Sequence, residues 1–191
     1  MCETKPRKLM ATRTLACCAL LAALSVVLAR LLIPMPDSTT RFSIEAVPVF
    51  MAGMLFGPLA GGLVGFCADF VGCLFSPYGF NPIFCIPPIL YGVFGGVMRP
   101  LFRQKINIPR LLVGLLPPVV IGSVLYQSFA LAYVYYYETF MEGLVLKLST
   151  RSVQFAITMV LDAVVIALLF KTNIFTRLGL WNPQRRPYDD C

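Results

Sequence analysis

The stretch that decides the fold is residues 44–75, which read IEAVPVFMAGMLFGPLAGGLVGFCADFVGCLF. A helix that crosses a membrane needs about 20 apolar residues, with a range of about 17 to 25, so this block is too long for one crossing. Gly57 and Pro58 interrupt it, and the run GPLAGG that they begin is typical of a tight turn. The block therefore predicts two membrane spans, at 44–56 and 59–75, and the first is so short that it must be tilted or deeply placed.

The whole chain has the composition of a membrane protein. Of its 191 residues, 58% are hydrophobic and 13% are charged, whereas about 25% of the residues in a typical soluble domain are charged. A single soluble core of this size has no room for so much apolar surface. We therefore expect one domain in a polytopic integral membrane protein.

Four further apolar stretches complete the expected fold, an all-α integral membrane protein with six transmembrane helices. They cover residues 12–33, 83–99, 111–137 and 145–170. The membrane domain is thus expected over 12–171, between a basic segment at 1–11 and a cytoplasmic tail at 172–191. The first stretch follows basic residues, as the apolar part of a signal peptide does. It is long for the apolar part of one, however, and no small-x-small cleavage site follows, so we expect a retained span.

The basic residues predict which side of the membrane each segment faces, because cytoplasmic loops carry an excess of Lys and Arg. With six spans and both termini in the cytoplasm, the outer side keeps four cations. They are Arg30, Arg41, Lys147 and Arg151. The other 12 of the 16 fall on the cytoplasmic side: Lys5, Arg7, Lys8, Arg13, Arg99, Arg103, Lys105, Arg110, Lys171, Arg177, Arg185 and Arg186. If block 44–75 crossed only once, the basic segment 99–110 would lie outside, so the charges favour two crossings. The net charge of +7 then reflects topology and not a nucleic-acid surface.

Motifs for catalysis and for nucleotide hydrolysis are absent from the sequence. There is no histidine, which excludes a histidine-based triad and an HExxH zinc site, and there is neither GxSxG nor a P-loop. The seven cysteines include no CxxC pair, and we interpret them as small apolar packing residues. We predict that the chain is not an enzyme, and that active transport by it would need another chain's ATPase or an ion gradient.

Ionisable residues inside the expected spans are the strongest indication of a functional site. Asp69 and Asp162 lie within spans, where a charge costs about 2.5–3.5 kcal/mol on insertion scales and needs a partner or a purpose. On the outer side, Lys147 and Arg151 are four residues apart and share one helix face. One interpretation is structural ion pairing, for example of Asp69 with an arginine. The other is an outward-facing polar cavity for an anionic ligand that also carries an amide- or guanidine-like edge.

Aromatic residues at the outer mouth fit the second interpretation, because they can stack on a flat ring, although anchoring at the membrane interface is their commoner role. Together with the charged groups and one amide they make up the candidate substrate-binding set. This set is Arg41, Asp69, Tyr78, Asn81, Phe84, Lys147 and Arg151. We expect no metal site and no catalytic residue.

Small residues recur at four-residue spacing, which lets helix backbones approach closely. Ala19 and Ala23 form such a pair in the first span, and glycine pairs of the same spacing lie in the next three. Packing among the chain's own helices is one explanation for them. For the first span, contact with a partner protein is the other.

The segment from Ala52 to Gly72 follows the pattern AG-x-x-x-GP-x-x-GG-x-x-G-x-x-AD-x-x-G, with Pro48 before it. It strongly resembles the folate-family S components of energy-coupling-factor (ECF) transporters, and residues 20–36 look like the first span of that family. The resemblance implies a six-helix protein that binds a vitamin, here folate or a reduced folate, in an outward-facing cavity. It also implies a prokaryotic plasma membrane, a transmembrane T subunit and two ATP-binding-cassette ATPases as partners. ATP would then be hydrolysed by the partners, and this chain would carry no cofactor.

In this family, small residues on the first helix contact the T subunit, and Ala19 and Ala23 fit that role. One departure concerns the loop before the fourth span, where the folate type carries a Phe-Pro-Gly-Phe-like run and this chain reads FNPIFCIPP at 80–88. Two alternatives to folate binding therefore stay open. One is an S component for another small molecule, such as a queuosine precursor or another vitamin. The other is a membrane scaffold or assembly partner without a ligand.

Overall fold

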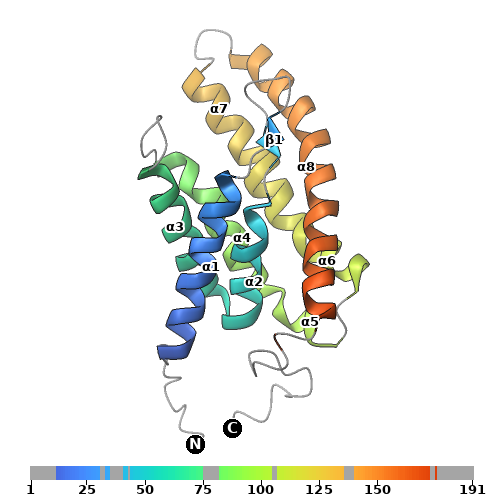
Figure 1. The fold of residues 1–191 in the computed structure, drawn as a ribbon. Coiled ribbons are helices and arrows are strands. Elements are labelled where there is room, and N and C mark those ends of the chain that lie inside the picture. Colours follow the sequence, from blue (N-terminus) through green and yellow to red (C-terminus); the bar gives the residue numbers. More distant parts are fainter. Residues whose placement is uncertain are drawn as a thin grey trace, which may run out of the picture.

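The computed structural model describes residues 12–30, 33–34, 41–42, 44–74, 82–104, 107–135, 140–172 and 175. Nearly all of them are helical (Figure 1). The helices are α1 (Thr12–Arg30), α2 (Ala46–Phe56), α3 (Pro58–Leu74), the 3-10 helix η1 (Pro82–Cys85), α4 (Ile86–Val97), α5 (Arg99–Gln104), α6 (Ile108–Pro117), the π-helix η2 (Pro118–Tyr126), α7 (Gln127–Tyr135) and α8 (Phe140–Lys171). Two short strands, β1 (Ile33–Pro34) and β2 (Arg41–Phe42), pair antiparallel, with Ile33 opposite Phe42.

Two of the helical segments are long and apolar enough to cross a membrane by themselves, those at Ile108–Ala130 and Arg151–Lys171. Four shorter apolar helices, at Thr14–Ala29, Ala46–Phe56, Pro58–Leu74 and Pro82–Val97, accompany them. These six segments overlap the six stretches that the sequence indicates as spans. The additional helix α5 occupies the basic segment between two of them.

The long apolar block divides into α2 and α3 at Gly57. Gly57 has φ 103°, a left-handed conformation that residues with a β-carbon rarely adopt, and its N–H donates to the carbonyl of Gly53 at 2.8 Å. Pro58 then begins α3, where its missing N–H leaves no helical hydrogen bond unmade. This local chemistry makes two packed helices from one apolar stretch.

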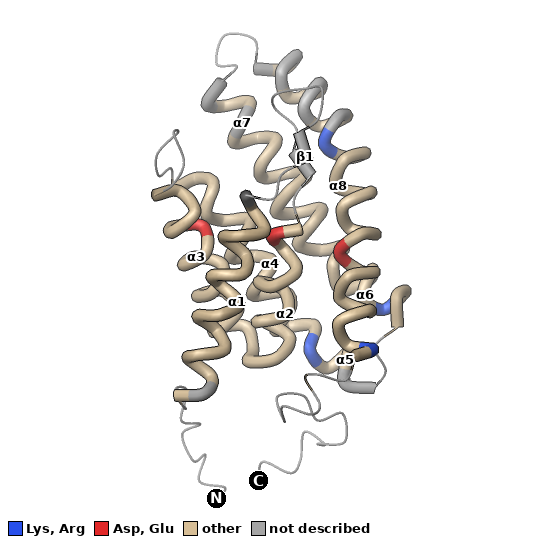
Figure 2. Tube along the Cα trace, viewed as in Figure 1, with Lys and Arg blue, Asp and Glu red and all other residues tan. Residues whose placement is uncertain are grey.

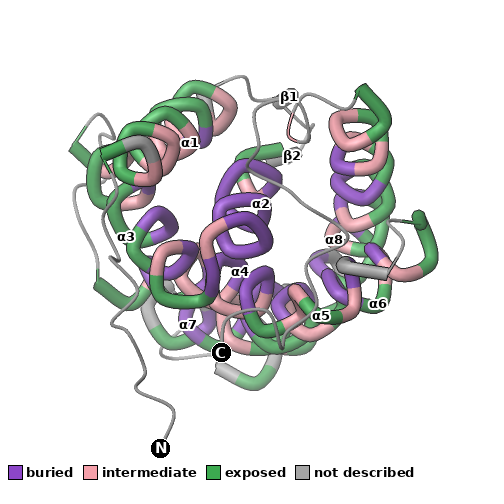
Figure 3. The backbone as a smooth tube through the Cα atoms, turned by 90° about the horizontal axis from the view of Figure 1, so that it is seen from below, coloured by how far each residue is buried: buried purple, intermediate pink, exposed green. Residues whose placement is uncertain are grey.

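Helices α2, α3 and α4 form a tightly packed unit whose contacts involve backbone atoms. A β-carbon added to Gly53 or Gly61 would collide with the carbonyl oxygen of Gly92, and one added to Gly65 would collide with that of Pro88. The glycine stripes on these helices therefore serve the chain's own packing. Helix α2 lies at the centre of the molecule, and all of its residues from Val47 to Leu55 are buried (Figure 3).

The remaining helices lie around this unit. Helix α1 packs on α2 and α3, while α8 packs on α6, η2 and α7 and also touches α2 (Figures 1 and 3). The segment from α6 through η2 to α7 changes its winding at Pro117 and Pro118, because two consecutive prolines supply no N–H to the preceding turn. Over η2, π-helical winding replaces the usual α-helical pattern of hydrogen bonds. Helix α8 thus packs mainly against a segment that contains two prolines and a π-helix, and this segment differs from the glycine-rich unit.

Candidate functional site

Helix α8 carries a row of four buried polar residues on one face. Arg151, Gln154, Thr158 and Asp162 are spaced by three, four and four residues, which places them along one side of a helix. Their neighbours Val153, Ile157, Val160 and Leu161 are exposed. The helix therefore turns its polar face inward and its apolar face outward, the reverse of a helix on the surface of a soluble protein.

Both charged members of this row have hydrogen-bonding atoms without a partner in the described part of the chain. Arg151 is 9% exposed, and neither its Nε nor its Nη1 has one. Asp162 is 1% exposed, and its Oδ1 has none. Buried charges are normally paired, since an isolated one costs several kcal/mol. A bound ligand with a carboxylate at one end and N–H groups at the other would satisfy both.

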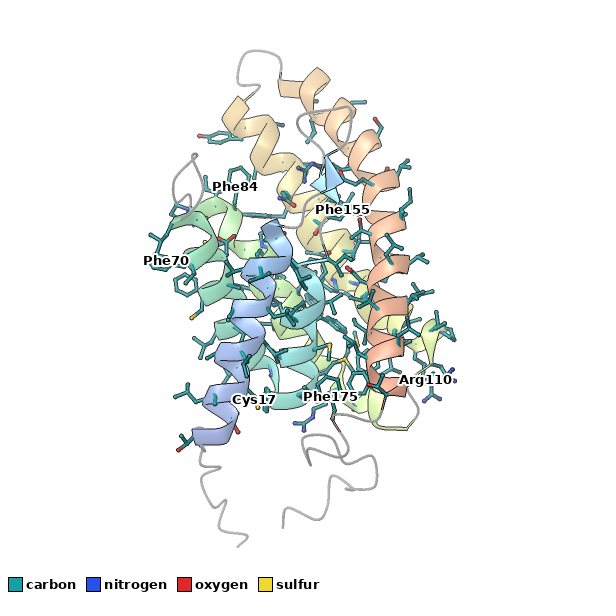
Figure 4. The ribbon with its side chains drawn as sticks, viewed as in Figure 1. Cys17, Phe70, Phe84, Arg110, Phe155 and Phe175 are labelled. Carbon is teal, nitrogen blue, oxygen red and sulfur yellow. The ribbon has the colours of Figure 1, made fainter. Side chains whose placement is uncertain are left out.

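Two further contacts of the row lie within α8 itself. The Oγ1 atom of Thr158 donates to the backbone carbonyl of Gln154 at 3.1 Å, within α8 itself. The guanidinium carbon of Arg151 lies 5.8 Å from the centroid of the Phe155 ring, which allows a cation–π contact (Figure 4). That contact supplements hydrogen bonds to the guanidinium and does not replace them.

Other polar groups gather around Asp162. The hydroxyl groups of Tyr91 on α4 and Ser123 on η2 lie 3.0 Å apart, and both residues are buried. Glu45, which precedes α2, is close enough to Asp162 for their carboxylates to interact, and both carboxylates act on Tyr91. Ser25 of α1 donates to the carbonyl oxygen of Glu45 at 2.8 Å and so attaches α1 to the start of α2. Buried polar residues of α4, η2 and α8 thus lie near the start of α2, where Glu45 itself is exposed.

The electrostatics differ along the row. Arg151 lies nearer the end of α8 that follows α7, whereas Asp162 is more deeply buried, within electrostatic range of Glu45. Eleven residues of helix separate them, about 16 Å at 1.5 Å per residue. An anionic group is therefore favoured at Arg151 and repelled near Asp162, where donors of N–H bonds are favoured instead.

The predicted site residues do not all come together. Arg151 belongs to the row on α8. Lys147 lies one turn before it on α8 and Arg41 lies on β2, but their side chains are outside the described residues, as are Tyr78 and Asn81 altogether.

Asp69 and Phe84 lie at a different place. Asp69 is on α3, which is on the opposite side of the molecule from α8 (Figure 3). Among the described residues its hydrogen bonds come from two thiols, those of Cys85 at 2.7 Å and Cys73 at 3.8 Å, and not from an arginine. Phe84 is half-buried in the adjoining η1, near the end of α3 (Figure 4). Asp69 and Arg151 are thus held in separate polar clusters.

Sequence reasoning did not select Gln154, Thr158 and Asp162 as site residues. A signal for them was nevertheless present, since polar residues at i, i+3, i+7 and i+11 interrupt an otherwise apolar helix on a single face. Asp162 stood out as an ionisable residue within a span, but no one-dimensional pattern says whether the shared face of Arg151 and Asp162 points into the protein.

The small residues of α1 lie on its outer surface. Ala19 and Ala23 are both exposed, and so are Leu20, Leu24 and Val27. This face of α1 is not covered by the described helices. Lipid or another membrane protein can therefore contact it.

The described residues contain no group of three or more Cys, Asp or Glu that could hold a metal ion. What the α8 site offers is recognition chemistry: a guanidinium, a carboxylate, an amide and hydroxyl groups in a buried environment.

Comparisons with known proteins point to one family. The sequence model of a family described as "ECF-type riboflavin transporter, S component" matches residues 9–175. The folate transporter FolT of Clostridium novyi is 34% identical to this chain over 73 residues, which make up 38% of this chain and 41% of that protein. The sequence match thus spans about two fifths of the curated relative. A crystal structure described as FolT bound with folic acid is similar in fold, with a TM-score of 0.67 and 24% identity, over 84% of this chain and 98% of that one.

Proposed function

We propose that this chain, which belongs to the ECF-type riboflavin transporter S component family, binds folate or a reduced folate along α8 and delivers it across the membrane. The observation that carries the proposal is the presence of two buried charged residues on α8, Arg151 and Asp162, each with polar atoms that have no hydrogen-bond partner among the described residues. Folate has two carboxylates at its glutamate end and a row of N–H donors on its pterin edge. It therefore complements both charges at once.

In this arrangement the guanidinium of Arg151 binds a glutamate carboxylate, and the carboxylate of Asp162 accepts N–H bonds from the pterin. Glu45 beside Asp162 opposes the reverse orientation, since it would repel the ligand's carboxylates. The pterin then lies deep in the protein, and the glutamate lies toward the mouth.

Folate fits better than riboflavin, although riboflavin gives the family its description. Riboflavin is uncharged and has no group that would pair with a buried guanidinium. The similarity to two proteins that are called FolT also favours folate. The family description nevertheless makes riboflavin the alternative ligand to be tested.

The chain is proposed to cross the membrane six times with both termini in the cytoplasm. The crossings would be α1, α2, α3, η1 with α4, the continuous segment from α6 to α7, and α8. An even number of crossings places the start of α1 and the end of α8 on one side. Arg99, Arg110 and Lys171 lie toward that end of the molecule, as the positive-inside rule requires, and Arg151 lies toward the other (Figure 2).

Family membership further supports a prokaryotic plasma membrane as the location and ATP-driven transport as the process. The proposed partners are a transmembrane T subunit and two ATP-binding-cassette ATPases, which hydrolyse the ATP, so that this chain carries no cofactor. The exposed Ala19 and Ala23 on α1 are proposed to contact the T subunit, because small side chains let a second helix come close.

Calorimetric titration of the purified chain in detergent tests the substrate and the site together. Folic acid is expected to bind saturably, with one molecule per chain. Arg151→Ala is expected to weaken binding about 10- to 150-fold, since a hydrogen bond to a charged group contributes about 1.5–3 kcal/mol. Asp162→Asn is expected to weaken it to a similar degree.

Lys171→Ala is the matched control, because it removes a cation from the exposed end of the same helix. Its affinity for folic acid is expected to equal that of the unaltered chain. Unchanged affinity in both Arg151→Ala and Asp162→Asn would contradict the site. Binding of riboflavin without binding of any folate would overturn the assignment of folate as the substrate and leave family membership unaffected.

A further inference from the structure

Away from the α8 site, two thiols and a carboxylate meet where α3 ends. The sulfur of Cys85 lies 2.7 Å from Oδ2 of Asp69, and the sulfur of Cys73 lies 3.8 Å from the same oxygen. Neither cysteine is in a disulfide. Because both sulfur atoms contact one oxygen atom, they are close neighbours.

The backbone explains why these sulfur atoms meet. Cys73 is four residues after Asp69 on α3, so the two share a helix face. Cys85 comes from η1, which packs against α3 and leads directly into α4. Helices α3 and α4 are in backbone contact between Gly65 and Pro88, where no β-carbon would fit. This contact holds the two cysteines on facing elements and limits how far they can separate.

We propose that Cys73 and Cys85 are a site of reversible oxidation, which forms an intramolecular disulfide between α3 and η1 by exchange with a low-molecular-weight disulfide. Cys73 is half-buried and reacts first with the small disulfide, whereas Cys85 is only 4% exposed. This order makes Cys73 the entry point and Cys85 the residue that resolves the mixed disulfide.

The exchange balances in two steps. The Cys73 thiolate attacks one sulfur of the small disulfide, which forms a mixed disulfide and releases one small thiol that takes up the Cys73 proton. Cys85 then attacks the Cys73 sulfur as its proton passes to Oδ2 of Asp69, the second small thiolate leaves, and that thiolate collects the proton. The protein loses two hydrogen atoms and two electrons, and the small disulfide is reduced to two thiols.

Oxidation would change the surroundings of Asp69 as well as link two elements. Both thiol donors to its carboxylate disappear when the S–S bond forms. Cys67 provides an internal contrast, because it lies on the same helix but is exposed, and no hydrogen bond joins it to Asp69 in the described part of the chain. The proposal concerns the pair at Asp69 and not the cysteines of the chain in general.

The test exposes the purified, full-length chain in detergent to glutathione buffers of increasing disulfide content. Samples are quenched with acid, alkylated and digested, and their peptides are analysed by mass spectrometry. We expect a linked pair of peptides that contain Cys73 and Cys85, lighter by two hydrogen atoms than the separate peptides and released by dithiothreitol. Alkylation of both residues at every buffer ratio, or linkage of other cysteines in preference to this pair, would overturn the proposal.

Two variants distinguish disulfide formation at this pair of cysteines from general reactivity of the thiols in the chain. Cys85→Ser is expected to abolish the link completely and to leave Cys73 as a stable mixed disulfide with glutathione, since the resolving thiol is gone. Cys67→Ser is the matched control and is expected to form the link as the unaltered chain does. If Cys85→Ser does not fold, the peptide map of the unaltered chain decides the question alone.

Discussion

Helices α2, α3 and α4 approach one another backbone to backbone, whereas α8 faces the interior with long polar side chains. In the first region glycine removes the side chains, and the carbonyl oxygens of Gly92 and Pro88 occupy the space where β-carbons would be. In the second region Arg151 and Asp162 are buried with polar atoms unpartnered among the described residues. The first region is stabilised by its own close packing. The second has buried polar atoms that the described residues do not pair, which is the physical character of a binding site.

The contrast predicts that substitutions are tolerated least in the glycine-rich unit formed by α2, α3 and α4. Gly92→Ala is expected to lower stability by at least about 3 kcal/mol or to prevent folding, because its β-carbon meets the backbone of Gly61 and cannot be relieved by a side-chain rotation. Thermal unfolding in detergent and the yield of monodisperse protein measure the effect.

Gly72→Ala is the control for that substitution, since a β-carbon there meets nothing within 4 Å. It is expected to leave stability unchanged or to raise it by up to about 1 kcal/mol through helix propensity. Equal melting temperatures for Gly92→Ala and the unaltered chain would remove the basis for a rigid glycine unit.

The polar face of α8 is predicted to behave in the opposite way. Arg151→Met is expected to raise the stability of the ligand-free chain by about 1–3 kcal/mol, because an apolar side chain of similar length replaces a buried charge whose Nε and Nη1 have no partner among the described residues. The same substitution is expected to weaken folate binding about 10- to 150-fold, as Arg151→Ala does. Thermal unfolding without and with folic acid separates the two effects. A large loss of stability without ligand would instead identify Arg151 as a structural residue.

A change of similar size but opposite sign is expected where a polar pair is already complete. Tyr91→Phe removes one partner of the 3.0 Å contact with Ser123 and is expected to cost about 1–3 kcal/mol, since it leaves the other hydroxyl buried and unpaired. Adding Ser123→Ala is expected to recover much of that loss. A double-mutant cycle measured by thermal unfolding tests the coupling, and strict additivity of the two substitutions would show that the hydroxyl groups do not interact in solution.

Local features explain which elements were predictable. The apolar stretches and the Gly57-Pro58 interruption are properties of a few consecutive residues, and helices of the structure overlap these stretches. The π-helical winding of η2 was not predicted. How a helix accommodates two missing N–H groups depends on the neighbours against which it packs.

The candidate site was predictable only in part, because its residues come from elements far apart in the chain. Arg151 was selected as an outer-side cation that shares a helix face with Lys147, and the structure buries it on the inner face of α8. Asp69 was selected as an ionisable residue within a span, yet its partners are thiols on its own side of the molecule. Asp162 lies on the same helix as Arg151. It faces the interior because of the way α8 is rotated about its own axis.

The amino-acid sequence by itself determined that this chain is an apolar, helical protein of the ECF S component type, divided at Gly57, with charges that must be either paired or functional. Those conclusions depend on hydrophobicity, turn chemistry and family motifs, which act over short distances along the chain. Only the tertiary structure decided which carboxylate lies with thiols and which lies on the face of Arg151. That choice depends on how the helices rotate and approach, and the approach is set where glycines let backbones touch.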